Sequence, residues 1–173
     1  EQGVNFIDTA ELYPTTPLSA ETQGDTEQII GRYMKERECR DQFVIATKVG
    51  GPGIAHLRGG RNIDSTSITE ALEGSLRRLQ TDYVDLYQIH WPNRGHYHFR
   101  KNWSYEPKVG ARDEYDNEII DILGALDRQI KLGKIRAVGL SNETAWGTAS
   151  FLRLAEAHHL PRMVSIQNEY SLL

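Results

Sequence analysis

Polar side chains that can move protons occur where several short apolar runs of this sequence end. Asp8 ends the first run, and Tyr13 follows it in the next loop. Lys48 ends the second run, and His90 ends the third. In a parallel α/β fold the carboxyl ends of the strands open onto one face, where ligands bind. One polar strand end means little, but the recurrence predicts that these four side chains converge.

An acid, a tyrosine, a lysine and a histidine form a consistent set for proton transfer. A free phenol has a pKa of about 10, too high for easy proton donation at neutral pH. We expect the Lys48 ammonium to lower the pKa of Tyr13, and Asp8 to keep Lys48 charged. His90 would bond a substrate oxygen and fix its orientation. The set predicts a general acid directed at a carbonyl oxygen that becomes an alkoxide.

Neutral polar residues end the two remaining runs. Ser141 and Asn142 follow the fourth, and Gln167 ends the fifth. Their hydroxyl and amide groups suit a carboxamide better than an anion. Trp91, directly after the third run, is a candidate pocket wall, although core packing accounts for it nearly as well. The Gly-rich residues 50–60 contain neither the dinucleotide fingerprint nor a Walker pattern, which predicts a flexible loop beside the site.

The spacing of apolar residues predicts the elements that position these side chains. Five apolar runs predict strands, at residues 4–8, 43–48, 84–90, 135–140 and 163–167. Four stretches of helical period separate them, and Ser67 with Glu70 three residues on predicts a capped helix start. Strand–helix alternation implies parallel strands joined by right-handed crossovers. The irregular residues 91–115 predict an inserted loop over the active-site face.

Composition narrows the class of protein. The chain has 173 residues, of which 39% are hydrophobic and 25% charged, as in globular domains. The net charge of −4 argues against a nucleic-acid partner, and no apolar run approaches the roughly 18 residues of a membrane span. Cys39 alone cannot form a disulfide framework, so we expect a reducing, cytoplasmic compartment. His96 and His98 have a zinc-like spacing that no third ligand completes, so we expect no metal.

Five short motifs occur in one order along the chain. They are IDTAELY at residues 7–13, TK at 47–48, DLYQIH at 85–90, GLSN at 139–142 and IQN at 166–168. Together they resemble the aldo-keto reductase family. The segments ETQGDTE at residues 21–27 and SNET at 141–144 are similar to its Tas-like bacterial branch in particular.

This resemblance implies an NADPH-dependent oxidoreductase that reduces aldehydes or ketones to alcohols, with a small-molecule carbonyl compound as its partner. Tyr13 would be the proton donor. Asp8 and Lys48 would tune it, and His90 would position the carbonyl. The residues that would hold the nicotinamide carboxamide are Ser141, Asn142 and Gln167.

The resemblance also implies a (β/α)8 TIM barrel, which takes about 250 residues when complete. Five strands predict a partial barrel across residues 1–173, with about the second to sixth strands. The first strand would precede Glu1, and the last two, with their phosphate-binding loops, would follow Leu173. Open edges at residues 4–8 and 164–167 would leave backbone groups unpaired. We therefore expect this piece alone to aggregate, to bind cofactor poorly and to be inactive.

Two other functions fit the same residues. Lys48 could form a Schiff base, as in class I aldolases, although Asp8 would oppose the neutral amine that this needs. Some relatives in the same family are nucleotide-binding regulatory subunits of potassium channels with very slow turnover. The four proton-transfer residues alone do not separate these classes, and they leave the carbonyl substrate, the choice between NADPH and NADH, and the oligomeric state open.

Overall fold

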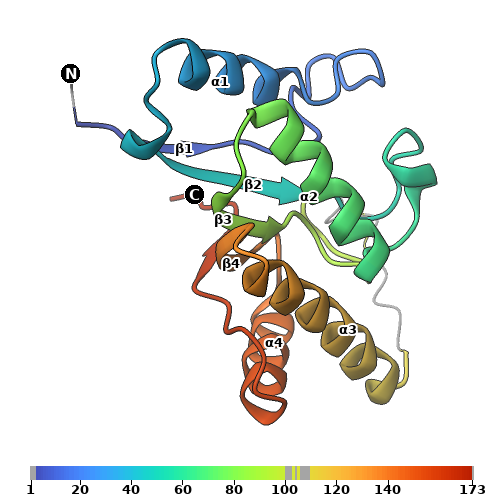
Figure 1. Cartoon of the computed structure of the whole chain (residues 1–173). Coiled ribbons are helices and arrows are strands. Elements are labelled where there is room, and N and C mark those ends of the chain that lie inside the picture. The colour runs from blue at the N-terminus through green and yellow to red at the C-terminus, as the bar shows by residue number, and fades with distance from the viewer. Residues whose placement is uncertain (1–2, 100–102, 104, 106–109, 173) are drawn as a thin grey trace.

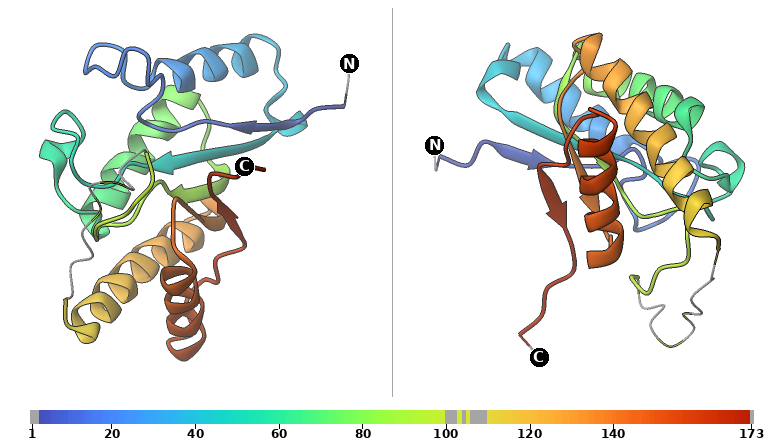
Figure 2. Two further views of the ribbon diagram at one scale, coloured as in Figure 1. Left: turned by 180° about the vertical axis from the view of Figure 1, so that it is seen from behind. Right: turned by 90° about the horizontal axis from the view of Figure 1, so that it is seen from below.

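The computed structural model describes all residues except 1–2, 100–102, 104, 106–109 and 173. In this part of the chain, five parallel strands form one sheet in the order of the sequence. The sheet curls, and four helices lie along its outer side (Figures 1 and 2). The predicted alternation and the predicted partial barrel are confirmed.

The strands are β1 (Phe6–Asp8), β2 (Val44–Val49), β3 (Val84–Ile89), β4 (Ile135–Ser141) and β5 (Ser165–Gln167). The helices are α1 (Asp25–Glu36), α2 (Ser65–Leu79), α3 (Arg112–Lys131) and α4 (Ala145–Ala157). Two single turns of 3-10 helix, η1 (Arg40–Gln42) and η2 (Arg58–Gly60), interrupt the loops on either side of β2.

The register of the sheet brings the strand ends to one edge. Lys48 pairs with Gln88 across β2 and β3, and Ser141 pairs with Gln167 across β4 and β5. Apolar side chains from the strands pack against the helices and exclude water from the layer between them. The largest fully buried apolar side chains include Ile45, Ile135 and Leu140 from the strands and Ile68, Leu72, Leu79, Leu123 and Leu126 from α2 and α3. This core fixes the strands and therefore the edge that carries the polar residues.

Helix α2 begins slightly earlier than predicted. Its cap is Asp64, whose side chain accepts a hydrogen bond from the Ser67 backbone N–H at 2.7 Å. The Ser67 hydroxyl is buried and donates to the Asn62 carbonyl, so it does not cap the helix as predicted. An aspartate is as good a cap as a serine, and the local pattern did not rank the two.

Strands β1 and β5 are the two ends of the described sheet. Phe6 is 51% exposed and Ile166 is 46% exposed, as expected for side chains on an open edge. No helix in the described part of the chain has the length and apolar character needed to span a membrane.

Helices α1 and α2 pack closely together at Gly31. A Cβ atom there would lie 2.3 Å from the Arg78 carbonyl oxygen and 2.6 Å from the Leu79 carbonyl carbon. Because both are backbone atoms, Gly31→Ala must move the helices apart. We expect this substitution to lower the free energy of unfolding by about 1–3 kcal/mol, measured by denaturant titration of the complete gene product.

Gly124→Ala is the matched control on α3. A Cβ atom there would meet only the end of the Arg128 side chain, at 3.7 Å. Alanine favours a helix over glycine by up to about 1 kcal/mol, so this change should stabilise the protein. Equal destabilisation by both substitutions would contradict the role of the α1–α2 contact.

Candidate active site

The four residues predicted to transfer protons meet at the carboxyl edge of the sheet. Lys48 Nζ lies 2.6 Å from Asp8 Oδ2, and the same nitrogen lies 5.1 Å from the centroid of the Tyr13 ring. The Tyr13 and His90 rings meet edge to face, with centroids 5.6 Å apart. Asp8 ends β1, Lys48 lies in β2 and His90 directly follows β3, so three neighbouring strands supply this group.

Asp8 accepts hydrogen bonds from more residues than the sequence predicted. It accepts hydrogen bonds from Lys48, from Gln88 Nε2 at 3.3 Å and from Gln167 Nε2 at 3.2 Å. The bond from Gln167 joins the two end strands of the sheet across its curl. Gln88 escaped the sequence analysis because it is not at a strand end. Its position two residues before His90, on the same face of β3, was the available signal.

Lys48 is buried, with 1% of its side chain exposed. Its ammonium group donates to Asp8 and to the Thr9 carbonyl oxygen at 2.9 Å. Burial lowers the pKa of Lys48, and the hydrogen bond and charge of Asp8 oppose that change. The ion pair with Asp8 therefore stabilises the ammonium form of Lys48, which burial alone would destabilise.

The pKa of Tyr13 departs from its expected direction. Burial raises it, and the negative charge of Asp8 raises it further. The lowered pKa that we expected for Tyr13 is therefore not found. The Lys48 ammonium faces the Tyr13 ring and gives its hydrogen bonds to Asp8 and Thr9, so its charge does not outweigh the effects of burial and of Asp8. A raised pKa keeps the phenol protonated at neutral pH, so the Tyr13 hydroxyl has a proton that it could donate.

His90 is a neutral imidazole in this site. Burial lowers the pKa of His90 to about 3, and the charge of Lys48 contributes to the same shift. Its backbone is fixed by a bond from its N–H to the Val49 carbonyl and by one from Asn142 Nδ2 to its own carbonyl, at 3.0 and 2.9 Å. A neutral ring with one N–H can donate to a substrate oxygen without competing as an acid.

The lowered pKa of His90 makes stability depend on pH. An unfolded histidine takes up a proton below about pH 6.5, whereas His90 in the folded protein does so only near pH 3. The contribution of His90 to the free energy of unfolding is therefore complete above about pH 6.5 and is lost as the pH falls toward 3. Between pH 7 and pH 5 we expect a loss of about 2 kcal/mol in the free energy of unfolding.

Denaturant titration of the complete gene product at both pH values measures this loss. The other histidines also titrate, so the quantity to compare is the difference between the wild type and His90→Gln, which lacks the titrating ring. The pH dependence should be smaller in His90→Gln by about the same 2 kcal/mol. Identical pH dependence in the two proteins would show that folding does not lower the pKa of His90.

Ser141, Asn142 and Gln167 also come together. The Ser141 hydroxyl and the Asn142 backbone N–H both donate to the Gln167 carbonyl, each at 3.0 Å. Asn142 has a left-handed backbone (φ 52°), and its Nδ2 also donates to Ser141 Oγ at 3.1 Å. The group is uncharged and adjoins Asp8 through Gln167, so its chemistry suits an uncharged carboxamide beside the proton donor.

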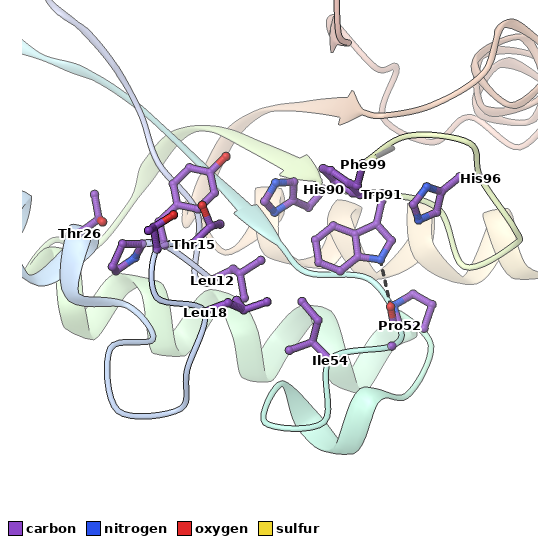
Figure 3. A pocket seen from close by; sticks show the side chains of 14 residues that line it. Leu12, Thr15, Leu18, Thr26, Pro52, Ile54, His90, Trp91, His96 and Phe99 are labelled. Atoms are coloured by element: carbon purple, nitrogen blue, oxygen red, sulfur yellow. Dashed lines mark hydrogen bonds between the residues drawn. The ribbon is translucent and has the colours of Figure 1, made fainter. Parts of the chain in front are cut away.

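A cavity of about 750 Å³ opens beside Tyr13 and His90, and both residues line it. Trp91 lines it too, with its indole N–H bonded to the Pro52 carbonyl at 3.1 Å (Figure 3). The Gly-rich loop therefore lies beside the site, as predicted. The remaining lining residues are Leu12, Pro14, Thr15, Thr16, Leu18, Thr26, Pro52, Gly53, Ile54, His96 and Phe99.

Within the predicted inserted loop at residues 91–115, His96 and Phe99 line the cavity. The loop ends earlier than predicted, because residues 112–115 form the first turn of α3. Residues 100–102, 104 and 106–109 of this prediction lie outside the described part of the chain. The His96 and His98 rings stack with centroids 6.1 Å apart. Among the described residues, no group of three or more His, Cys, Asp or Glu side chains is placed to hold a metal ion.

Comparison with known proteins agrees with this geometry. A family model described as the aldo/keto reductase family matches residues 1–173. The chain is 46% identical over 176 residues to Protein tas of Escherichia coli (strain K12), covering 99% of this chain and 49% of that protein. It is 33% identical over 174 residues to aldo-keto reductase YhdN of Bacillus subtilis (strain 168), covering 99% and 41%. The chain thus spans about half the length of the curated relatives it matches.

Solved structures show the same fold. An aldo-keto reductase from Klebsiella pneumoniae in complex with NADPH superposes with a TM-score of 0.64 at 26% identity, over 96% of this chain and 43% of that one. The aldo-keto reductase Tm1743 in complex with the inhibitor epalrestat gives a TM-score of 0.63 at 28% identity, over 95% and 44%.

Proposed function

This chain belongs to the aldo/keto reductase family, and on that premise we propose that it carries the proton-transfer site of an NADPH-dependent oxidoreductase that reduces aldehydes or ketones to alcohols. The observation that carries the proposal is the pair of Tyr13 and His90 on the wall of one cavity, with Lys48 and Asp8 behind Tyr13. A carbonyl group in this cavity would meet a protonated phenol and a neutral imidazole together.

The chain would position the carbonyl and deliver a proton. The His90 imidazole would donate a hydrogen bond to the carbonyl oxygen and hold it near the Tyr13 hydroxyl. As the carbonyl carbon accepts a hydride, the oxygen becomes an alkoxide and takes the Tyr13 proton, which forms the alcohol and leaves a phenolate. The Lys48 ammonium beside the ring would then stabilise that negative charge.

A nicotinamide cofactor fits the uncharged group at the ends of β4 and β5. Ser141, Asn142 and Gln167 would hold its carboxamide, and the hydrogen bond from Gln167 to Asp8 supports a position of this group near the proposed proton donor. Two aldo-keto reductase structures from Klebsiella pneumoniae, with NADPH and with NADP and acetate, support this choice of cofactor. When bound, NADPH would supply the hydride.

A Schiff-base aldolase is the second candidate, and the lowered pKa of Lys48 favours it. Schiff-base formation needs a free amine lone pair. Lys48 instead forms an ion pair with Asp8 at 2.6 Å and a bond to the Thr9 carbonyl, which stabilise the ammonium form. The reductase is therefore the better supported reading of this lysine.

The deciding experiment follows NADPH consumption by the complete gene product with a panel of aldehydes and ketones. The reductase predicts steady turnover and the matching alcohol as product. Tight NADPH binding with turnover near zero on every substrate would favour a regulatory nucleotide-binding subunit. A covalent adduct on Lys48 after borohydride treatment with a carbonyl compound would favour the aldolase.

A further inference from the structure

Glu11 is a buried carboxylate that the proposed reaction does not use. Only 2% of it is exposed. Arg58 holds both of its oxygens, with Nη1 at 2.7 Å from Oε2 and Nη2 at 2.8 Å from Oε1. Two parallel bonds from a guanidinium to a carboxylate fix both the distance and the orientation of the pair.

The Glu11–Arg58 ion pair binds both backbone polar groups of one residue, Gly50. The Gly50 N–H donates to Glu11 Oε1 at 2.6 Å, and Arg58 Nη2 donates to the Gly50 carbonyl at 2.9 Å. A Cβ at Gly50 would lie 2.6 Å from Leu57 Cδ1, so the pair and the loop close tightly around this glycine. Gly50 is therefore held in place by charge as well as by packing.

The ion pair joins the two segments that carry the proton donor and its lysine. Glu11 lies two residues before Tyr13, and Gly50 lies two residues after Lys48. The Glu11 backbone N–H also donates to the Lys48 carbonyl at 3.2 Å. A shift of Gly50 would therefore displace the segments that carry Lys48 and Tyr13.

The wall of the cavity begins directly after Gly50. A Cβ at Gly51 would lie 2.4 Å from Trp91 Nε1, so the backbone there rests on the indole ring. Pro52 accepts the Trp91 N–H and lines the cavity together with Ile54. Leu12, Leu57 and Trp91 form a small apolar cluster separate from the main core. The main core therefore does not by itself hold this wall.

We propose that the Glu11–Arg58 ion pair positions the substrate-facing wall of the cavity by fixing Gly50, and through it Pro52 and Trp91. Neither charged residue lines the cavity, so both are positioning residues. A buried ion pair adds little net stability when it replaces apolar packing, but it can specify one geometry. The identity of the substrate in this inference rests on the proposed function.

Glu11→Gln tests the inference in the complete gene product. The amide keeps the shape but loses the charge and one acceptor oxygen. Hydrogen–deuterium exchange of the peptide 49–60 should become faster by roughly tenfold, because the Gly50 N–H loses a charge-assisted bond. KM for the carbonyl substrate should rise by roughly tenfold while kcat changes by less than about threefold, since a misplaced wall weakens binding more than chemistry. The Kd of NADPH should change by less than about twofold.

The matched control is Glu70→Gln, which removes an ion pair between Arg61 and Glu70 at the far end of the same loop. These two side chains are 43% and 51% exposed, so neither exchange nor KM should move. Arg58→Lys keeps the charge but cannot form the paired bonds, and should give an intermediate rise in both readouts. It also replaces Glu11→Gln if that variant fails to fold.

Faster exchange at residues 49–60 with an unchanged KM would overturn the inference, because the pair would then be structural only. Unchanged exchange would overturn it as well. If the wild-type protein reduces no carbonyl compound, the proposed function has failed, and the exchange measurement alone decides whether the pair holds the wall.

Discussion

Tyr13→Phe is expected to lower kcat for carbonyl reduction by about 10²- to 10⁴-fold, the range typical of a lost general acid. The substitution removes only the hydroxyl group and keeps the ring that meets His90 edge to face. The raised pKa of Tyr13 means that the wild-type hydroxyl carries its proton at neutral pH. Single-turnover rates with saturating NADPH would measure the loss directly.

NADPH affinity gives the control for this result. Tyr13→Phe leaves Ser141, Asn142 and Gln167, the residues proposed to hold the carboxamide, unchanged, so the Kd of NADPH should stay nearly the same. Tyr33→Phe, an exposed tyrosine on α1, should affect neither quantity. Equal loss of NADPH binding and turnover in Tyr13→Phe would argue against its role as the acid.

Lys48→Met is expected to lower kcat by about 10²- to 10³-fold. Methionine fills a similar volume but leaves Asp8 without its buried cation and removes the positive charge 5.1 Å from the Tyr13 ring centroid. The Asp8 carboxylate already raises the pKa of Tyr13, and without Lys48 it acts unopposed. A phenol of higher pKa is a weaker acid, so the maximal rate falls.

The pH profile separates this cause from a loss of structure. The acid must be protonated to react, so kcat declines at alkaline pH as Tyr13 ionises. In Lys48→Met this decline should move to higher pH, whereas simple misfolding would lower the rate without moving it. Lys131→Met, at an exposed lysine of α3 paired with Asp127, should leave the whole profile unchanged. A decline at lower pH than in the wild type would contradict the proposed electrostatics.

The elements that carry the site were predictable because their signals are local. Apolar runs of strand length and stretches of helical period reflect which faces are buried, and neighbouring residues encode this. The carboxyl ends of parallel strands open onto one face, and this rule predicted that Asp8, Lys48 and His90 meet. The three residues span 82 positions of the chain (90 − 8). The structure confirms the elements and this meeting of side chains.

The contacts between distant residues were not predictable in the same way. Gln88 and Gln167 both donate to Asp8, and Arg58 closes on Glu11 over 47 positions of sequence. No periodicity marks such pairs, because they depend on the register of the sheet and on the path of two loops. Each residue alone is an ordinary polar side chain.

The sequence by itself therefore determined the parallel α/β architecture and named the four residues that are proposed to transfer protons, Asp8, Tyr13, Lys48 and His90. Only the tertiary structure decided how the set behaves. In the folded protein, burial and the charge of Asp8 raise the pKa of Tyr13. Burial and the charge of Lys48 lower the pKa of His90 to about 3. Burial and distance between charges arise from the packing of segments far apart in the chain, and local residue patterns do not encode them.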